Sequence, residues 1–505
     1  MTPMAAFSSA LAAITRPFTA LRSFLGLLFA PIAWLLAPVI RKIGVLARRY
    51  FPPTTLVYIG MIFLAILAAC GAIALSGTKT GVALALLAVL GPIALYYALV
   101  APLVFPFSLF VIAIPFDNLL QMAAYGTMTK LFAALAAGAI IVWLIRTRRF
   151  VIPSRPLLFW GAFVCWEVLS IAWALDPQLA AQRIITPLEL FLLYAAISFL
   201  PIDERMLKVV IAATILGAAL AGGYGAYVFH GGNNVGGGGR LFLANDQTLI
   251  DPNHFASSLL GPFAIAITMF VMTRSALVRF VVALAIAAMA LGFAVASSRG
   301  ALLGMVVMFI YLVWRSPRRL LLGGIGLAGM ALGLAVYGRV LQRFSNAAST
   351  GGAGRSQIWH VGVNAFKQHW LAGAGYGNFP VAFDQSFLTV SQTYYTSWHR
   401  DSHNILIGNG VELGIIGLVL MLLAWKAQFS ALRFIGREHR LYALRVAIEG
   451  AILGLFVSGM FLDLMTEKYL WLIFILAALT HNVARGPARA PIVHAYMHAR
   501  SWRFG

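Results

Sequence analysis

The sequence is poor in charge and almost free of cysteine. Only 10% of its 505 residues are charged and 61% are hydrophobic, whereas a soluble protein carries about 25% charged residues. This composition argues against a soluble globular fold. The two cysteines, Cys70 and Cys165, lie inside apolar runs. We therefore expect neither a disulfide framework nor a cysteine metal cluster.

Several enzyme signatures are also absent from the sequence. It contains no Gly-x-Ser-x-Gly nucleophile elbow, and the glycine-rich run at 231–239 lacks the Lys-Ser/Thr pair of a phosphate-binding loop. His399 and His403 have i, i+4 spacing, but no glutamate-rich zinc signature accompanies them. These absences argue against a serine hydrolase and a nucleotide site, and we expect no metal and no other cofactor.

Long apolar runs dominate what the sequence does contain. Runs of roughly 20 apolar residues are typical of transmembrane helices, and the backbone has no other hydrogen-bond partner in lipid. The predicted fold class is all-α, a polytopic transmembrane helical protein of about 12–14 spans with a large external helical cap loop. The runs lie at 54–76, 81–99, 102–116, 128–145, 156–174, 185–200, 209–229, 254–273, 280–297, 300–314, 320–337, 406–425, 446–463 and 468–483.

The net charge of +22 does not indicate a nucleic-acid partner, because the basic residues mostly separate the apolar runs. Placing the basic cluster at 41–49 in the cytoplasm puts most other lysines and arginines there too, as the positive-inside rule expects.

With this orientation, the sequence divides into five segments. They are a basic cytoplasmic or interfacial N-terminal segment at 1–50, a transmembrane body at 51–337, an external loop at 338–405, transmembrane helices at 406–484 and a basic cytoplasmic tail at 485–505.

One histidine and four arginines are predicted on the external face, although they are far apart in the sequence. They are His403, Arg299, Arg355, Arg183 and Arg400. Histidine has a near-neutral reference pKa and can act as a general base, and the planar arginine fork matches phosphate oxygens. Structural roles remain open for each one. A histidine is often structural, and an arginine can snorkel to headgroups or pair with an acid.

Other polar residues have capping or charge-neutralising interpretations. Asp251-Pro252-Asn253-His254 is typical of a helix start, where Asp and Asn cap free N–H groups. Glycines precede Arg355 at another expected helix start, which could receive an anion. Acids in or near the apolar runs are functional candidates by default, but each could instead neutralise an arginine. They are Glu167, Glu189, Glu449 and Asp463.

Taken together, these motifs resemble the O-antigen ligase and polymerase superfamily. The most specific is His403-Asn404, nine residues, then Gly414-x-x-Gly417. The resemblance runs from about residue 103 to residue 420 and includes further, weaker motifs. They are Ser170…Trp173…Asp176-Pro177, Asp251-Pro252-Asn253, Ser298-Arg299-Gly300, Arg355-x-x-x-Trp359 and Gly373-x-Gly375-x-Gly377-x-Phe379.

The resemblance implies a glycosyltransferase of the bacterial inner membrane with its active site facing the periplasm. Such enzymes move a glycan from undecaprenyl diphosphate to an acceptor hydroxyl, here O-antigen to lipid A–core, by metal-independent inverting transfer. The implied partners are the lipid-linked glycan donor, the lipid A–core or glycan acceptor, and membrane lipid, with no nucleic acid. The implied base is His403 and the implied diphosphate contacts are Arg299 and Arg355; the external-face prediction adds Arg183 and Arg400, with Asn404 and Trp359 as supporting residues.

Alternatives remain within and outside this family. A polysaccharide polymerase would use the same donor and extend lipid-linked chains, and a protein O-oligosaccharyltransferase would modify serine or threonine. A membrane transporter belongs to a different class, but the sequence has no detectable inverted repeat. A scaffold for envelope assembly would leave His403 without a role.

Overall fold

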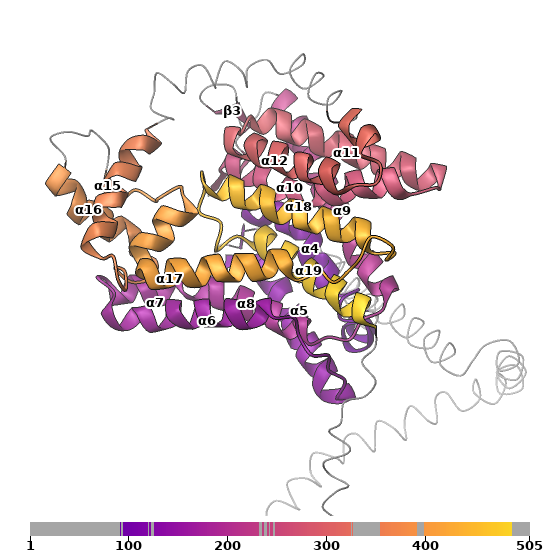
Figure 1. The fold of residues 1–505 in the computed structure, drawn as a ribbon, viewed down its shortest axis with the longest axis horizontal. Helices are drawn as coiled ribbons and strands as arrows, with labels where there is room; N and C mark the ends of the chain where they lie inside the picture. Colours follow the sequence, from indigo (N-terminus) through magenta and orange to yellow (C-terminus); the bar gives the residue numbers. More distant parts are fainter. Residues whose placement is uncertain are drawn as a thin grey trace, which may run out of the picture. The chain divides into compact units, whose positions relative to one another are not determined.

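In a computed structural model the chain is a bundle of apolar helices with a smaller helical cap (Figure 1). The structure describes residues 91, 94–119, 121–122, 126–231, 235–236, 240–241, 243–245, 248–324, 326, 354–390 and 398–486. The predicted runs 54–76 and 320–337, most of 81–99, and the segment at 1–50 lie mainly or wholly outside these residues. The account below concerns the compact unit that begins at Tyr97.

The first half of this unit carries helices separated by short strand pairs. They are α4 (Phe107–Ala113), η1 (Ile114–Leu119), β1 (Gln121–Met122), β2 (Gly126–Thr127), α5 (Met128–Thr147), α6 (Pro156–Leu169), η2 (Ser170–Trp173), α7 (Pro177–Arg183), α8 (Ile185–Ser198), α9 (Glu204–His230), β3 (Val235–Gly236), β4 (Arg240–Leu241), β5 (Leu243–Asn245) and β6 (Thr248–Ile250). The strands pair antiparallel as β1–β2, β3–β4 and β5–β6.

In the second half, the regular elements among the described residues are all helices. Its elements are α10 (Pro252–Met272), α11 (Ala276–Ala296), α12 (Arg299–Arg315), α15 (Arg355–Gln368), α16 (Phe379–Val390), α17 (Ile405–Ser430), α18 (Tyr442–Gly459) and α19 (Lys468–Arg485). The helices α15 and α16 fall in the external loop at 338–405, where the sequence predicts a helical cap.

Eight helical segments in the described part are long and apolar enough to cross a membrane. They are α5, α6 with η2, α7 with α8, α9, α10, α11, α17 and α18. The predicted polytopic helical fold is therefore confirmed. The expected helix at 102–116 differs, because it consists of the seven-residue α4 followed by the 3-10 turn η1. Pro106 and Pro115 explain the difference, since proline lacks the amide that a continuous helix needs.

Small residues and buried aromatic rings hold the bundle together. The helices α12 and α18 cross at Gly304 and Gly454, where a Cβ on Gly304 would lie 2.4 Å from the Gly454 carbonyl oxygen. Close backbone approach at small residues is the usual way for membrane helices to pack. Elsewhere Trp160 of α6 stacks on Phe474 of α19 at 4.9 Å between ring centroids. This contact joins the two helices within the core.

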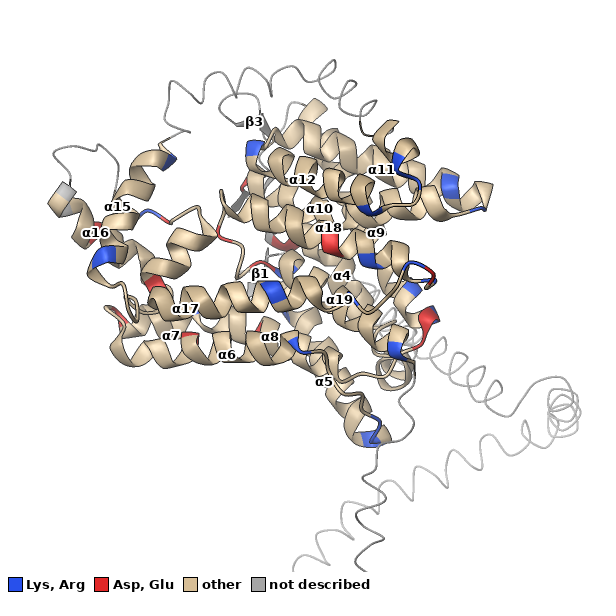
Figure 2. Cartoon of the chain, viewed as in Figure 1, with Lys and Arg blue, Asp and Glu red and all other residues tan. Residues whose placement is uncertain are grey.

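Basic side chains gather at one end of the bundle. Figure 2 shows lysine and arginine at the ends of α5, α9 and α11 that lie away from α15 and α16. At the opposite end, α15 and α16 pack against each other and against α17. The bundle therefore has a basic end and a capped end, and the candidate site lies at the capped end.

Candidate active site

A cavity of about 790 Å³ lies where several helix connections meet. Its walls come from η1, the start of α5, the α7–α8 junction, the starts of α10 and α17, and the connection between α18 and α19. The cavity concentrates acidic groups, since six of the chain's 15 acids line it. They are Asp117, Asp251, Asp401, Glu412, Asp463 and Glu467; the lining cations are Lys130, Arg183 and Lys468, and the lining histidines are His254 and His403.

The position of His403 in this wall is set by the start of α17. Asn404 is the N-cap of that helix, and its Oδ1 accepts the amides of Leu406 and Ile407 at 2.9 and 3.0 Å. His403 immediately precedes this cap and has a φ of 45°, in the left-handed region. Its backbone amide donates to Asp463 Oδ2 at 3.1 Å. The sequence motif His-Asn therefore places the imidazole at the cavity, just before a capped helix.

Asp463 organises the backbone around His403. Its Oδ1 accepts the hydroxyl of Ser402 at 2.5 Å while Oδ2 accepts the His403 amide. Burial raises the pKa of Asp463, and the Ser402 hydrogen bond and nearby His403 lower it. Trp359 of α15 donates its indole N–H to the Ser402 carbonyl at 3.1 Å. The predicted supporting residue Trp359 thus joins the cap to the segment that carries His403.

The predicted diphosphate arginines Arg299 and Arg355 share one neighbourhood. Each is the first residue of its helix, α12 and α15, and Gly354 ahead of Arg355 has a φ of 81°. Burial lowers the pKa of Arg355; nearby Arg299 also lowers it, whereas Asp251 and Asp463 raise it. Two guanidinium groups therefore lie within electrostatic reach of each other, and Arg355 also interacts with two carboxylates of the cavity wall.

The other two predicted arginines have different surroundings. Arg183 lies at the end of α7, lines the cavity and donates to the Gly377 carbonyl at 3.0 Å. This bond is to a backbone carbonyl and not to an acid, which was the alternative that the sequence left open. Arg400 is exposed and is not among the residues that line the cavity. Of the four arginines, Arg183 lines the cavity, Arg355 interacts with carboxylates of its wall, Arg299 interacts with Arg355, and Arg400 is exposed.

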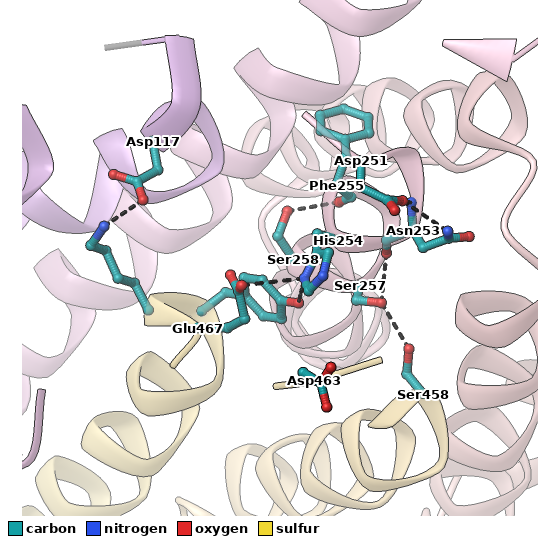
Figure 3. A network of polar contacts seen from close by, with 12 residues as sticks. Asp117, Asp251, Asn253, His254, Phe255, Ser257, Ser258, Ser458, Asp463 and Glu467 are labelled. Carbon is teal, nitrogen blue, oxygen red and sulfur yellow. Dashed lines mark hydrogen bonds and ion pairs between the residues drawn. The ribbon is translucent and has the colours of Figure 1, made fainter. Parts of the chain in front are cut away.

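A second polar group on the cavity wall was missed by the sequence interpretation. His254 Nδ1 lies 3.1 Å from Tyr469 Oη and 3.3 Å from Glu467 Oε1, and Lys468 forms an ion pair with Asp117 (Figure 3). The available signal was the charged stretch 463–468 between two apolar runs. His254 itself stood in a motif that we interpreted only as a helix cap.

Glycines of two sequence motifs, Gly373-x-Gly375-x-Gly377 and Gly414-x-x-Gly417, meet at a break in α17. Gly414 has φ 67° and ψ −168°, which interrupts the helix. Carbonyl oxygens before the break, on Val411 and Glu412, accept amides of residues 374 and 375 at 2.8 and 2.9 Å. After the break, the Ile415 amide donates to the Trp370 carbonyl at 2.7 Å. The segment 370–377 is thus inserted into the helix break and lies beside the cavity.

The candidate acids Glu449 and Glu167 and the histidine His399 differ in their contacts. Glu449 forms a buried ion pair with Arg445 at 2.9 Å, as the neutralising interpretation expects. Both oxygens of Glu167 are buried and have no hydrogen-bond partner in the described part of the chain. His399 pairs with Asp384 at 2.5 Å. Within the same residues, no group of three or more His, Cys, Asp or Glu side chains is arranged to hold a metal ion.

One segment of the chain matches a known protein family. Residues 284–422 match the family model described as O-antigen ligase. The matched segment contains Arg299, Arg355 and the motif from His403 to Gly417, whereas His254, Asp463 and Glu467 lie outside it. No curated protein matches the chain.

Proposed function

Because residues 284–422 match the O-antigen ligase family model, we propose that the chain belongs to this superfamily and is a membrane glycosyltransferase moving a glycan from undecaprenyl diphosphate to an acceptor hydroxyl. The acceptor that we propose is lipid A–core, and the product is ligated O-antigen. One observation carries the proposal. His403 lines a large cavity at the capped end of the bundle, and Arg355, which lies within electrostatic reach of Arg299, interacts with two carboxylates of that cavity, Asp251 and Asp463.

The transfer is a single displacement. The acceptor oxygen attacks the anomeric carbon, the bond from that carbon to the lipid diphosphate breaks, and the diphosphate leaves with the electron pair. Arg299 and Arg355 stabilise the leaving charge, since preorganised cations act strongly in a site shielded from water. His403 accepts the proton of the acceptor hydroxyl, a contribution of typically about 10²–10⁴ in rate. A single displacement inverts the anomeric configuration.

The cavity's surroundings support this assignment of roles. Asp463 and Asn404 hold the backbone on either side of the imidazole, so the base has a defined position. Arg183 lines the same cavity and is a further candidate for contact with the donor. We propose no metal in the reaction, because the guanidinium groups supply the positive charge that the leaving diphosphate requires.

The distribution of charge supports a proposal for the location of the protein. Basic side chains gather at the end away from the cap (Figure 2), and basic ends face the cytoplasm in most membrane proteins. We therefore propose that the protein resides in the bacterial inner membrane with the cavity open toward the periplasm. The donor's polyprenyl chain would then remain in the bilayer while its glycan reaches the cavity.

The test uses the purified full chain in liposomes, with a synthetic undecaprenyl-diphosphate glycan and lipid A–core. Mass spectrometry identifies the products, and NMR of the new linkage reports inversion or retention. We expect glycan on lipid A–core, insensitivity to chelators, and a loss of about 10²-fold or more in His403→Ala. His360→Ala, an exposed histidine of α15, is the matched control.

Other products would redirect the assignment. Chains lengthened on the donor lipid would establish a polymerase, and glycan on a serine or threonine peptide would establish a protein glycosyltransferase. Full activity in His403→Ala, or its abolition by a chelator, would contradict the mechanism. An untouched donor and acceptor in the presence of correctly folded protein would refute glycosyl transfer itself.

A further inference from the structure

The cavity contains a second imidazole whose ring is held by a carboxylate. His254 lies in the first turn of α10 and lines the cavity. Its Nδ1 is 3.3 Å from Glu467 Oε1 and 3.1 Å from Tyr469 Oη (Figure 3). With the ring proton placed on Nδ1, both oxygens accept it and Nε2 keeps its lone pair. A histidine bound in this way has a fixed tautomer and a fixed ring orientation.

Neighbouring contacts fix the helix that carries this imidazole. Asp251 caps α10 by accepting the Asn253 amide at 2.6 Å. One turn later, the Ser257 hydroxyl contacts the Asn253 carbonyl at 2.8 Å and the Ser458 hydroxyl of α18 at 2.7 Å. His254 therefore lies on a helix start that is tied to α18 (Figure 3).

The carboxylate partner is held from the other side. Glu467 is the residue before α19, and its neighbour Lys468 pairs with Asp117 of η1. Burial raises the pKa of Glu467; the nearby carboxylates Asp117 and Asp463 also raise it, whereas His254 and Lys468 lower it. The negative charge of the partly buried Glu467 side chain is thus compensated by His254 and Lys468.

We propose that His254 and Glu467 form a second acid–base pair of this cavity, which receives the acceptor proton from His403. This inference rests on the proposed glycosyl transfer. The acceptor O–H bond breaks, its oxygen bonds to the anomeric carbon, and the lipid diphosphate leaves with the electron pair. The proton moves first to His403 and from there to His254 Nε2, which leaves His403 free for the next acceptor; the positive charge on the His254 ring is stabilised by Glu467 beside Nδ1.

The two histidines of the cavity differ in how they are held. The contact between His403 and Asp463 is made by the backbone amide, whereas Glu467 contacts the ring of His254. An acid that contacts the far nitrogen of an imidazole, with the other nitrogen at the substrate, is the arrangement of general bases in hydrolases. A purely structural role would instead have the pair tie α10 to the α18–α19 connection.

The test measures steady-state transfer by the full chain in liposomes, with the same donor and acceptor. We expect His254→Gln to lower kcat by about 10–100-fold with little change in donor KM, and Glu467→Gln to lower it less. Imidazole added to His254→Ala should restore part of the rate, because it replaces the missing base. In a His403→Ala background, His254→Gln should lower the residual rate little further, because His254 then has no proton to receive from residue 403. His360→Ala is the control.

Three results would overturn the pair's proposed role. Wild-type kcat in His254→Gln would show that the ring takes no proton. A folded His254→Ala variant, by melting temperature and gel filtration, whose lost rate imidazole does not restore would show a structural role only. If the wild-type protein transfers no glycan at all, the proposed function fails and this inference fails with it; the first two results leave the proposed function intact.

Discussion

At the scale of single residues, the backbone of His403 depends on one carboxylate. Its φ of 45° lies in a region that non-glycine residues visit at a cost of about 1–3 kcal/mol. Asp463 offsets that cost by bonding to both Ser402 and His403 through separate oxygens. The position of the His403 imidazole at the cavity therefore depends on Asp463, which lies 60 positions later in the chain.

Replacing Asp463 should therefore impair transfer without unfolding the protein. In Asp463→Asn one oxygen becomes an amide, which cannot accept a hydrogen bond, so the His403 backbone shifts. Misplacement of a catalytic group by about 1 Å can cost about 10²-fold in rate, and we expect a fall in kcat of that order. The measurement is transfer together with melting temperature. Asp203→Asn, at the N-cap of α9, should leave both unchanged, and a wild-type rate in Asp463→Asn would disprove the positioning role.

The raised pKa of Glu467 makes a testable contribution to stability. A carboxyl whose pKa is higher in the folded state binds its proton more tightly there. Its stabilising contribution is therefore complete below the ordinary glutamate pKa of about 4.3 and is lost as pH rises through the raised value. We expect the melting temperature of wild type minus that of Glu467→Gln to fall as pH increases over this range. A constant difference from pH 4 to pH 8 would contradict the assignment.

At the scale of elements, the break in α17 explains why the sequence motif needs glycine. A Cβ on Gly414 would lie 2.2 Å from the Leu371 carbonyl oxygen, and one on Gly373 would lie 2.2 Å from the Glu412 carbonyl oxygen. Both glycines also have positive φ. The inserted segment and the broken helix therefore approach backbone to backbone, which keeps the carbonyl and amide groups at the break hydrogen-bonded.

Gly414→Ala should destabilise the capped end and reduce transfer. The added methyl group meets backbone atoms that cannot move aside independently, and the backbone conformation of Gly414 (φ 67°, ψ −168°), which is almost restricted to glycine, adds a cost of about 1–3 kcal/mol. We expect a melting temperature several degrees lower and a larger loss of activity than of helix content. The matched control is Gly138→Ala in α5, where a Cβ meets nothing within 4 Å. Equal melting temperatures for the two variants would argue against the packing role of Gly414.

At the scale of the whole molecule, periodicity and composition predict the membrane bundle but not the contacts within the site. The apolar runs locate α5, α9, α10 and α11 closely because lipid imposes helices on them. The sequence does not predict that His254 contacts Glu467. These residues are 213 positions apart, and their meeting depends on how α10 packs against α18 and α19, which no local pattern encodes. The break at Gly414 was likewise hidden within a continuous apolar run.

The orientation of the whole bundle gives the last prediction. Cysteines are introduced one at a time into a Cys70→Ser/Cys165→Ser background, at exposed Gln385 in α16 or exposed Gly436 between α17 and α18. Because basic ends remain in the cytoplasm, a membrane-impermeant maleimide should label Gln385→Cys in intact spheroplasts. It should label Gly436→Cys only after permeabilisation, when both react equally. The reverse pattern would place the cavity in the cytoplasm. A periplasmic acceptor could then not reach His403, so this labelling experiment tests the physical premise of the proposed transfer independently of any activity assay.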